Sequence, residues 1–344
     1  MMAEPYSLRE VEIRSTPRPG TEAENPEIAV SATVFAATDA EYPTFFMCGG
    51  NNGILNKYVV GFKDERTGSG SLFYSWTQQL VLGSGINDIA LSGDSTHAAV
   101  AMEDGTIRLI DTNNLRQIDV LGTTNSDGPI TCVCYTPQSN LLIAGTYAGT
   151  VHIYDGRAPR KLLKRLSPAH ALPVSAVASH PDGSVFLSTG IDGIARVWDA
   201  TGPLLATIVG SENRGLGSGV FSPNGRFALL GALADGSLGL WDLAHSGRLK
   251  WVRKYPRNNM RYWMRATFMK DGTIVGGSED GNIFAWDPCT TEVIARYDIA
   301  KSKGIKIPLA CCASNSLILC GGMGSAYPVL LELKVDSDNH FHQH

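Results

Sequence analysis

Three side chains in the middle of the sequence have the residue types of a serine-nucleophile relay, in which a carboxylate orients a histidine that takes the proton of a hydroxyl. They are His170, Ser188 and Asp192, and Trp198 follows with an indole N–H donor. The same residue types also form structural networks, because buried polar groups cost free energy when they lack a partner. We predict that these four residues form a structural hydrogen-bond network and that none is catalytic.

Cysteine and histidine residues give two faint signs of a metal site. In Cys132-Val133-Cys134 both thiols would lie on one face of a strand, and the end of the chain carries His340, His342 and His344. Neither group has the spacing of a four-ligand zinc site. The seven cysteines are an odd number in a long chain, which is not a disulfide framework. We expect packed, reduced cysteines and neither a metal nor another cofactor.

One stretch combines cations with aromatic rings, as proteins do when they hold nucleic-acid backbones and stack bases. It includes Arg248, Lys250, Tyr255, Arg261 and Trp263. The chain as a whole has a net charge of -4 and offers no broad attraction to nucleic acid. We expect a solvated strand and loop without direct nucleic-acid binding; an acidic peptide or a nucleic acid is the alternative ligand.

Motifs of common enzymes and of targeting segments are absent from the sequence. There is no H-E-x-x-H, Walker or G-x-S-x-G motif, and the glycine-rich stretches 215–219 and 321–324 lie in strand and turn contexts. The first residues lack the features of a secretion signal, and no apolar run approaches the roughly 18 residues of a membrane helix. We expect a non-enzymatic protein of a reducing intracellular compartment, without a membrane anchor.

A repeat of about 44 residues sets the elements that carry these side chains. Each copy has an apolar run, a turn that usually contains glycine, and an aromatic or aliphatic residue followed by aspartate. These aspartates are Asp111, Asp155, Asp199, Asp242 and Asp287. In the copy that ends at Asp199, strands are predicted over 174–177, 185–188, 194–198 and 204–208. Four short strands in each copy of such a repeat are typical of a β-propeller blade.

Counting the copies predicts an all-β, seven-bladed propeller in one domain, residues 1–344. The predicted blades cover 29–80, 83–120, 128–165, 172–209, 215–254, 262–298 and 306–335. The last blade lacks a fourth strand, and residues 6–15 alternate well enough to supply it. The N-terminal strand would then close the ring by pairing with the last blade. Residues 16–28 would form a loop, and residues 336–344 a flexible tail.

The Trp-Asp pairs at 198–199, 241–242 and 286–287 identify the chain as similar to the WD-repeat β-propeller family. Residues 128–299 resemble one member more specifically, the propeller subunit of trithorax/COMPASS-type histone methyltransferase complexes. The stretches that carry this resemblance are 137–141 (PQSNL), 173–177 (PVSAV), 221–225 (FSPNG) and 277–280 (GSED), and 85–89 (GINDI) extends it into the second blade. The resemblance implies two peptide-binding surfaces, one on each face of the propeller.

On one face, the family binds an acidic and hydrophobic segment of another subunit in a groove between the fifth and sixth blades. The matching positions are Asn224, Phe227, Leu240, Lys250 and Phe268. An apolar floor with a cation at its rim suits such a segment. Lys270 and Cys289 depart from the family pattern.

On the other face, the family's central opening receives an arginine side chain between two aromatic rings. Its small and polar lining falls on Ala29, Asn87, Asp88 and Glu103 of this chain. The resemblance therefore implies that these four residues lie in the channel.

The aromatic clamp of that opening is not retained. Thr131 and Arg265 occupy the two ring positions, Ile191 replaces a third aromatic, and Trp263 lies two residues before Arg265. The change removes cation–π contacts of about 0.5 to 2 kcal/mol each. Arg265 also repels an incoming cation unless Asp88 or Glu103 neutralises it. We therefore expect poor binding of arginine peptides.

The sequence favours a non-catalytic scaffold, the WD-repeat subunit of a histone methyltransferase complex, which docks partner peptides, histone tails among them, on both faces. Such a subunit would be a monomeric propeller within a hetero-complex, and nuclear rather than cytoplasmic. A substrate receptor of a cullin-type ubiquitin ligase is the first alternative, because Tyr154-Asp155-Gly156-Arg157 resembles the WD-x-Arg element of those receptors. An adaptor in RNA processing or trafficking is the second.

Overall fold

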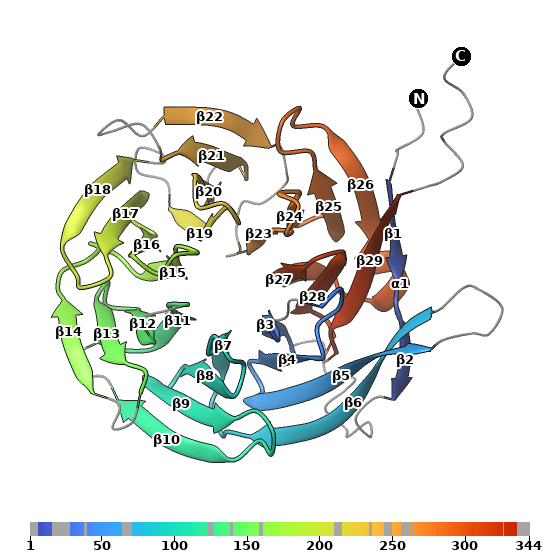
Figure 1. The fold of residues 1–344 in the computed structure, drawn as a ribbon, viewed down its shortest axis with the longest axis horizontal. Helices are drawn as coiled ribbons and strands as arrows, with labels where there is room; N and C mark the ends of the chain where they lie inside the picture. The colour runs from blue at the N-terminus through green and yellow to red at the C-terminus, as the bar shows by residue number, and fades with distance from the viewer. Residues whose placement is uncertain are drawn as a thin grey trace.

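Seven β-sheets stand side by side in a ring, with one strand of each at the centre and another at the circumference (Figure 1). The structure is a computed structural model and describes residues 6–15, 28–37, 40–63, 71–122, 127–137, 140–157, 161–209, 215–233, 236–243, 250–255, 262, 264–325 and 327–335. The predicted all-β, seven-bladed propeller is confirmed.

The strands of the first four blades follow one another along the chain. Blade one contains β3 (Val30–Phe35), β4 (Phe45–Gly50), β5 (Ile54–Lys63) and β6 (Ser71–Val81), and blade two contains β7 (Ile86–Leu91), β8 (His97–Met102), β9 (Thr106–Asp111) and β10 (Gln117–Gly122). Blade three contains β11 (Ile130–Tyr135), β12 (Leu141–Thr146), β13 (Val151–Asp155) and β14 (Leu162–Leu166), and blade four contains β15 (Val174–Ser179), β16 (Val185–Gly190), β17 (Ile194–Asp199) and β18 (Leu204–Val209).

The remaining blades complete the ring. Blade five contains β19 (Leu216–Phe221), β20 (Phe227–Ala232), β21 (Leu238–Asp242) and β22 (Lys250–Tyr255), and blade six contains β23 (Ala266–Phe268), β24 (Ile274–Gly277), β25 (Asn282–Trp286) and β26 (Val293–Asp298). Blade seven contains β27 (Ile307–Ser314), β28 (Leu317–Met323), β29 (Val329–Val335) and the N-terminal β1 (Tyr6–Glu10), and a short helix, α1 (Ile299–Lys303), precedes it.

The N-terminal segment closes the ring with its first half only. β1 pairs antiparallel with β29, as the sequence predicted. The prediction that residues 6–15 form one closing strand is wrong in its second half, because β2 (Glu12–Ser15) pairs parallel with β6 of blade one. β6 is the outermost strand of blade one, and β2 covers part of its free edge. Residues 6–15 therefore clasp both sides of the seam (Figure 1).

Apolar side chains lie between neighbouring blades. Each of the seven apolar clusters draws its buried residues from two adjacent blades. Phe46, Phe186 and Trp286 are among the largest fully buried side chains. Burying such a side chain contributes about 1.5–3 kcal/mol, so each blade is stable mainly because it packs on its neighbours.

Of the two features weighed as metal sites, the structure describes the thiols of Cys132 and Cys134 but not the tail histidines. All seven cysteines are free, and Cys132 and Cys134 of β11 both pack in the cluster between blades three and four. Among the described residues no group of His, Cys, Asp or Glu could hold a metal ion, and no helix has the length and apolar character needed to cross a bilayer. Most of the predicted loop 16–28 and the whole tail 336–344 lie outside the described residues.

Candidate peptide-binding surfaces

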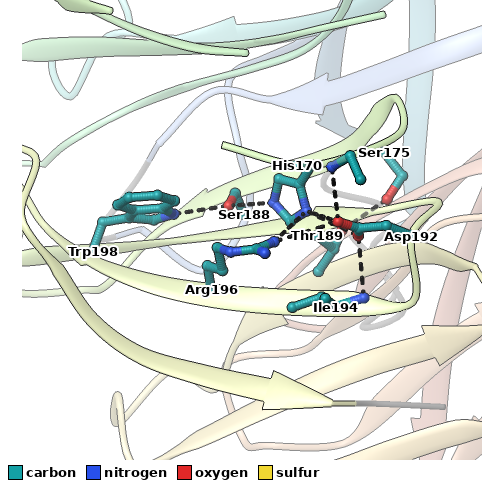
Figure 2. Close-up of polar contacts among 9 residues, drawn as sticks. His170, Ser175, Ser188, Thr189, Asp192, Ile194, Arg196 and Trp198 are labelled. Atoms are coloured by element: carbon teal, nitrogen blue, oxygen red, sulfur yellow. Dashed lines mark hydrogen bonds and ion pairs between the residues drawn. The ribbon is translucent and has the colours of Figure 1, made fainter. Parts of the chain in front are cut away.

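The structure brings the four residues of the predicted blade-four network together (Figure 2). Trp198 Nε1–H donates to Ser188 Oγ at 2.8 Å, and Ser188 Oγ lies 2.8 Å from His170 Nε2. His170 Nδ1 lies 3.0 Å from Asp192 Oδ1, and the N–H groups of Ala171 and Ile194 donate to the same carboxylate. The network ties the loop before β15 to β16, β17 and the turn between them.

Charge and burial give this network a structural role. Burial lowers the pKa of His170 and keeps the ring neutral. Burial alone would raise the pKa of Asp192, but the hydrogen bonds from His170 and the backbone lower it below its ordinary value. Ser188 has 0% exposure, and its Oγ already accepts the Trp198 N–H. A substrate cannot reach this hydroxyl.

A second buried network in blade three was missed by sequence reasoning. Asp127 pairs with His152 (Oδ2 to Nε2, 3.3 Å) and with Arg165, and Thr150 Oγ1 donates to Asp127 Oδ1 at 3.3 Å. His152 Nδ1 lies 3.1 Å from the hydroxyl of Tyr154. Burial lowers the pKa of His152 despite the nearby Asp127. In blade three the aspartate comes before the histidine in the chain, whereas in blade four the histidine comes first. A search for the blade-four order of residues therefore misses the blade-three network.

Four of the five predicted groove residues line one cavity of about 270 Å³ between blades five and six. Phe227 comes from the start of β20, Leu240 from β21, Phe268 from the end of β23, and Asn224 from the turn before β20. Leu240 and Phe268 are buried. The fifth predicted residue, Lys250, begins β22, and its side chain lies outside the described part of the structure.

One cation lines this groove and a second lies beside one of its aromatic rings. Lys270 is exposed and lines it. The guanidinium of Arg226 lies 5.1 Å from the centre of the Phe227 ring and pairs with Asp242 at 2.9 Å. Asp271 is the acid among the groove residues. Sequence reasoning placed the rim cation at Lys250 and gave no role to Arg226, which lies beside a groove aromatic.

The centre of the ring is lined by one equivalent residue from each blade. These residues are Ser31, Asn87, Thr131, Ser175, Gly217, Arg265 and Leu309, and together with Glu103, Pro129 and Tyr147 they bound a cavity of about 260 Å³. In the inner strands of all blades except the sixth, the ladder register shifts at this residue. A β-bulge redirects a side chain, and here it places the ring residue at the channel.

Several of these channel residues link neighbouring blades. Ser31 Oγ–H donates to the carbonyl of Ile86, and Thr131 Oγ1–H donates to that of Val174. Asn87 Nδ2–H donates both to the carbonyl of Ile130 and to Glu103 Oε2, each at 2.9 Å. These donors are therefore engaged within the protein rather than aimed at a ligand.

Arg265 reaches across the channel from blade six to blade two. Its Nη1–H donates to Asp88 Oδ1 at 2.7 Å, and Asp88 also accepts from the N–H groups of Ile89 (2.7 Å) and Val133 (2.9 Å). Burial works against the charge of Arg265, but Asp88 outweighs it and raises the pKa of the guanidinium. The sequence left open whether Asp88 or Glu103 neutralises Arg265, and the structure pairs it with Asp88.

Two other predicted channel residues, Ala29 and Ile191, are not among the residues that line this cavity. Ala29 is buried at the entry to blade one, where its N–H donates to Asn51 Oδ1 at 2.9 Å. Ile191 lies in the turn after β16, and its N–H donates to the carbonyl of Pro173. Trp263 lies outside the described residues. The aromatic side chain that does line the cavity is Tyr147, which is 59% exposed.

Known proteins match this chain at low to moderate identity. The family model for the WD domain, G-beta repeat, matches residues 76–111, 117–155 and 160–199. The COMPASS component SWD3 of Saccharomyces cerevisiae is 24% identical over 227 residues, which cover 62% of this chain and 70% of SWD3.

Two further relatives are proteins of the translation machinery by name. Eukaryotic translation initiation factor 3 subunit I of Aspergillus oryzae is 26% identical over 192 residues, 51% of this chain and 54% of the relative. Small ribosomal subunit protein RACK1y of Oryza sativa subsp. japonica is 31% identical over 166 residues, 46% of this chain and 48% of the relative. This chain thus spans about half the length of these two relatives.

The matched repeats are offset from the blades. Each begins at the outer strand of one blade, β6, β10 or β14, and ends with the third strand of the next. Every repeat therefore contributes to two blades and joins them covalently. The chain therefore carries WD repeats over these matched residues and folds as a seven-bladed β-propeller that β1 closes.

Proposed function

We propose that this propeller is a non-catalytic scaffold that docks a partner peptide in the groove between blades five and six, within a histone methyltransferase complex. The observation that carries the proposal is the convergence of Asn224, Phe227, Leu240 and Phe268 in one cavity. The similarity to the COMPASS component SWD3 supports the choice of complex. In this role the protein acts in the nucleus.

The groove favours an extended segment with apolar and acidic side chains. Phe227, Leu240 and Phe268 offer an apolar floor, and aliphatic or aromatic anchors bury well in such a pocket. Lys270 adds a positive charge to the lining, which attracts a carboxylate, whereas the Arg226 guanidinium beside Phe227 is paired with Asp242. Asn224 Oδ1 accepts from the Ser222 hydroxyl at 2.7 Å and from the Arg226 N–H at 3.1 Å, so the turn that carries these groups is held in place.

Affinity purification from native cells tests this proposal. The full chain should recover methyltransferase-complex subunits, and Phe227→Ala combined with Lys270→Glu should lose them. Lys301→Glu is the matched control, because Lys301 is 87% exposed and lies outside the groove. Recovery of the same subunits by the groove variant would contradict the docking site, and recovery of none by the unaltered chain would contradict the choice of complex.

The channel on the opposite face would take a partner other than an arginine peptide. Arg265 pairs with the buried carboxylate of Asp88, which is then not available to the guanidinium of a bound peptide. Calorimetry with short arginine-containing histone peptides should therefore give weak binding. Low-micromolar affinity for the channel would contradict this part of the proposal.

A role as substrate receptor of a cullin-type ubiquitin ligase is the second candidate. The observation that favours it is Arg157, whose side chain is 70% exposed beside Asp155 at the end of β13. An exposed arginine at this position is available to an adaptor subunit. Arg157→Ala would then lose the adaptor in affinity purification while keeping the partners of the blade five groove.

A further inference from the structure

A second groove lies between blades two and three. It has a volume of about 330 Å³, and its lining includes Asp94, His97, Tyr135, Asn140 and Arg157. Asp94 lies in the turn between β7 and β8, His97 begins β8, and Tyr135 ends β11. Asn224, Phe227 and Phe268 hold the same places in blades five and six, so the fold forms the same groove twice.

The two turns share one hydrogen-bond pattern. Ser92 Oγ–H donates to Asp94 Oδ1 at 2.6 Å and accepts from the N–H of His97 at 3.0 Å. In blade five, Ser222 makes the corresponding bonds to Asn224 (2.7 Å) and Phe227 (2.9 Å). The backbone of the two turns is therefore equivalent, and the grooves differ in the chemistry of their side chains.

The exchange of side chains turns an apolar groove into one rich in acceptors. Asp94 stands where the other groove has an amide, His97 where it has a phenyl ring, and Tyr135 where it has Phe268. This change adds one negative charge, one imidazole and one hydroxyl at matched positions. A groove of this kind no longer suits an apolar anchor, because the imidazole and the carboxylate would lose hydration without gaining a partner.

Hydrogen bonds fix which nitrogen of His97 faces a ligand. Thr96 Oγ1 lies 2.8 Å from Asp94 Oδ1 and 2.8 Å from His97 Nδ1. The ionised carboxylate only accepts, so the single hydroxyl proton of Thr96 goes to Asp94. Thr96 Oγ1 must then accept from His97 Nδ1–H, which leaves Nε2 of the neutral ring as an acceptor.

The positive charge in this groove is already paired. Arg157 donates through Nε to Asp155 Oδ1 at 3.0 Å and through Nη2 to Asp155 Oδ2 at 3.2 Å. This pair is neutral, so Asp94 leaves the groove with a net negative charge. Asp94 Oδ1 already accepts from Ser92 and Thr96, so what the carboxylate offers a ligand is its negative charge, while Nε2 of His97 accepts a hydrogen bond. Tyr135 adds an aromatic ring of the kind on which cations bind.

From these contacts we infer that the groove between blades two and three binds a basic side chain, a lysine or arginine of an extended partner segment. This site goes beyond the proposed function, because it is separate from the blade five groove and takes the opposite charge. The propeller then holds two kinds of peptide at equivalent positions, one acidic and apolar, the other basic.

Fluorescence anisotropy of labelled (Gly-Lys)4, (Gly-Arg)4 and (Gly-Glu)4 peptides tests the inference on the full chain. The two basic peptides should bind saturably, and Asp94→Asn should weaken them at least tenfold. Asn is the residue that blade five carries at this position, and its Oδ1 there accepts the same turn hydrogen bonds, so the variant keeps the turn. Asp94→Asn with His97→Phe gives the groove two residues of blade five and should abolish binding.

The control variant removes one negative charge from the other groove, between blades five and six. Asp271 is exposed, lines the blade five groove and accepts the N–H of Thr273, so Asp271→Asn should leave the affinity for the basic peptides within twofold. Equal losses in the two aspartate variants would show unspecific attraction and overturn the inference. Absence of saturable binding, or a preference for the glutamate peptide, would overturn it as well. None of these outcomes depends on recovery of a methyltransferase complex.

Discussion

Replacement of Arg265 by methionine tests whether the ion pair across the channel stabilises the ring. The pair joins blade six to blade two, and the Asp88 side chain is 3% exposed. Methionine keeps much of the arginine stem and removes only the charged head, so packing changes little. The variant leaves a buried carboxylate without its cation.

The expected cost follows from the remaining contacts of Asp88. Opposite charges about 4 Å apart attract by about 4 kcal/mol at an effective dielectric constant of about 20, and removing one partner of a buried pair costs about 3–5 kcal/mol. Arg265 is 31% exposed, and Asp88 keeps the N–H groups of Ile89 and Val133. These two facts reduce the expected loss in the free energy of unfolding below this range, to about 2–3 kcal/mol.

Urea denaturation followed by tryptophan fluorescence and circular dichroism measures this loss. Asp88→Asn in the Arg265→Met background should recover about half of it, because the uncompensated charge is gone. Lys301→Met is the matched control, since Lys301 is 87% exposed in its pair with Asp298 and should cost less than about 1 kcal/mol. A cost for Arg265→Met no larger than that control would refute the reasoning.

Three further outcomes are expected. Ser188→Ala removes the shared partner of the Trp198 indole and the His170 ring, and should lower the free energy of unfolding by about 2–3 kcal/mol while groove binding persists; a loss below about 0.5 kcal/mol would contradict the network. The pKa of His170 and that of Asp192 are both lowered on folding, so the stability that they contribute is complete above about pH 6.5 and declines on acidification, first through His170 and below about pH 4 through Asp192. Urea midpoints between pH 7 and 4 should fall, and should fall less for His170→Gln; identical slopes would contradict this account. Leu8→Ala opens a cavity where β1 closes the ring and should cost about 2–3 kcal/mol by the same assay, whereas an unchanged midpoint would show that β1 adds little to closure.

Most of the fold could be predicted from the repeat in the sequence. Strand pairing within a blade is local, so turns such as Asp192-Gly193 and the apolar runs beside them predict it directly. The blade-four network was also accessible, because His170, Ser188, Asp192 and Trp198 occupy fixed places in one repeat. The repeat did not indicate that β2 pairs with blade one, because its partner strand β6 is remote in sequence.

Some features of the candidate sites could also be predicted from the sequence, and others could not. Asn224, Phe227, Leu240 and Phe268 follow from alignment with related propellers, and the structure gathers them in one groove. The blade-three network, with its acid and histidine in reversed order, depends on which side chains meet in three dimensions. So does the likeness between the grooves at blades two and five, because their shared turn is visible only in its hydrogen bonds.

The repeat in the sequence predicts the number of blades, the order of their strands and the residue types at each repeated position. These properties depend on neighbours a few residues apart and on a constant spacing. Three features depend on the closed ring: Arg265 pairs with Asp88, β2 crosses the seam, and Thr96 orients His97 in a groove that Tyr135 of the next blade completes. Closing the ring places blades that are distant in sequence opposite one another, and side-chain pairing across that distance is set by geometry that no local pattern records.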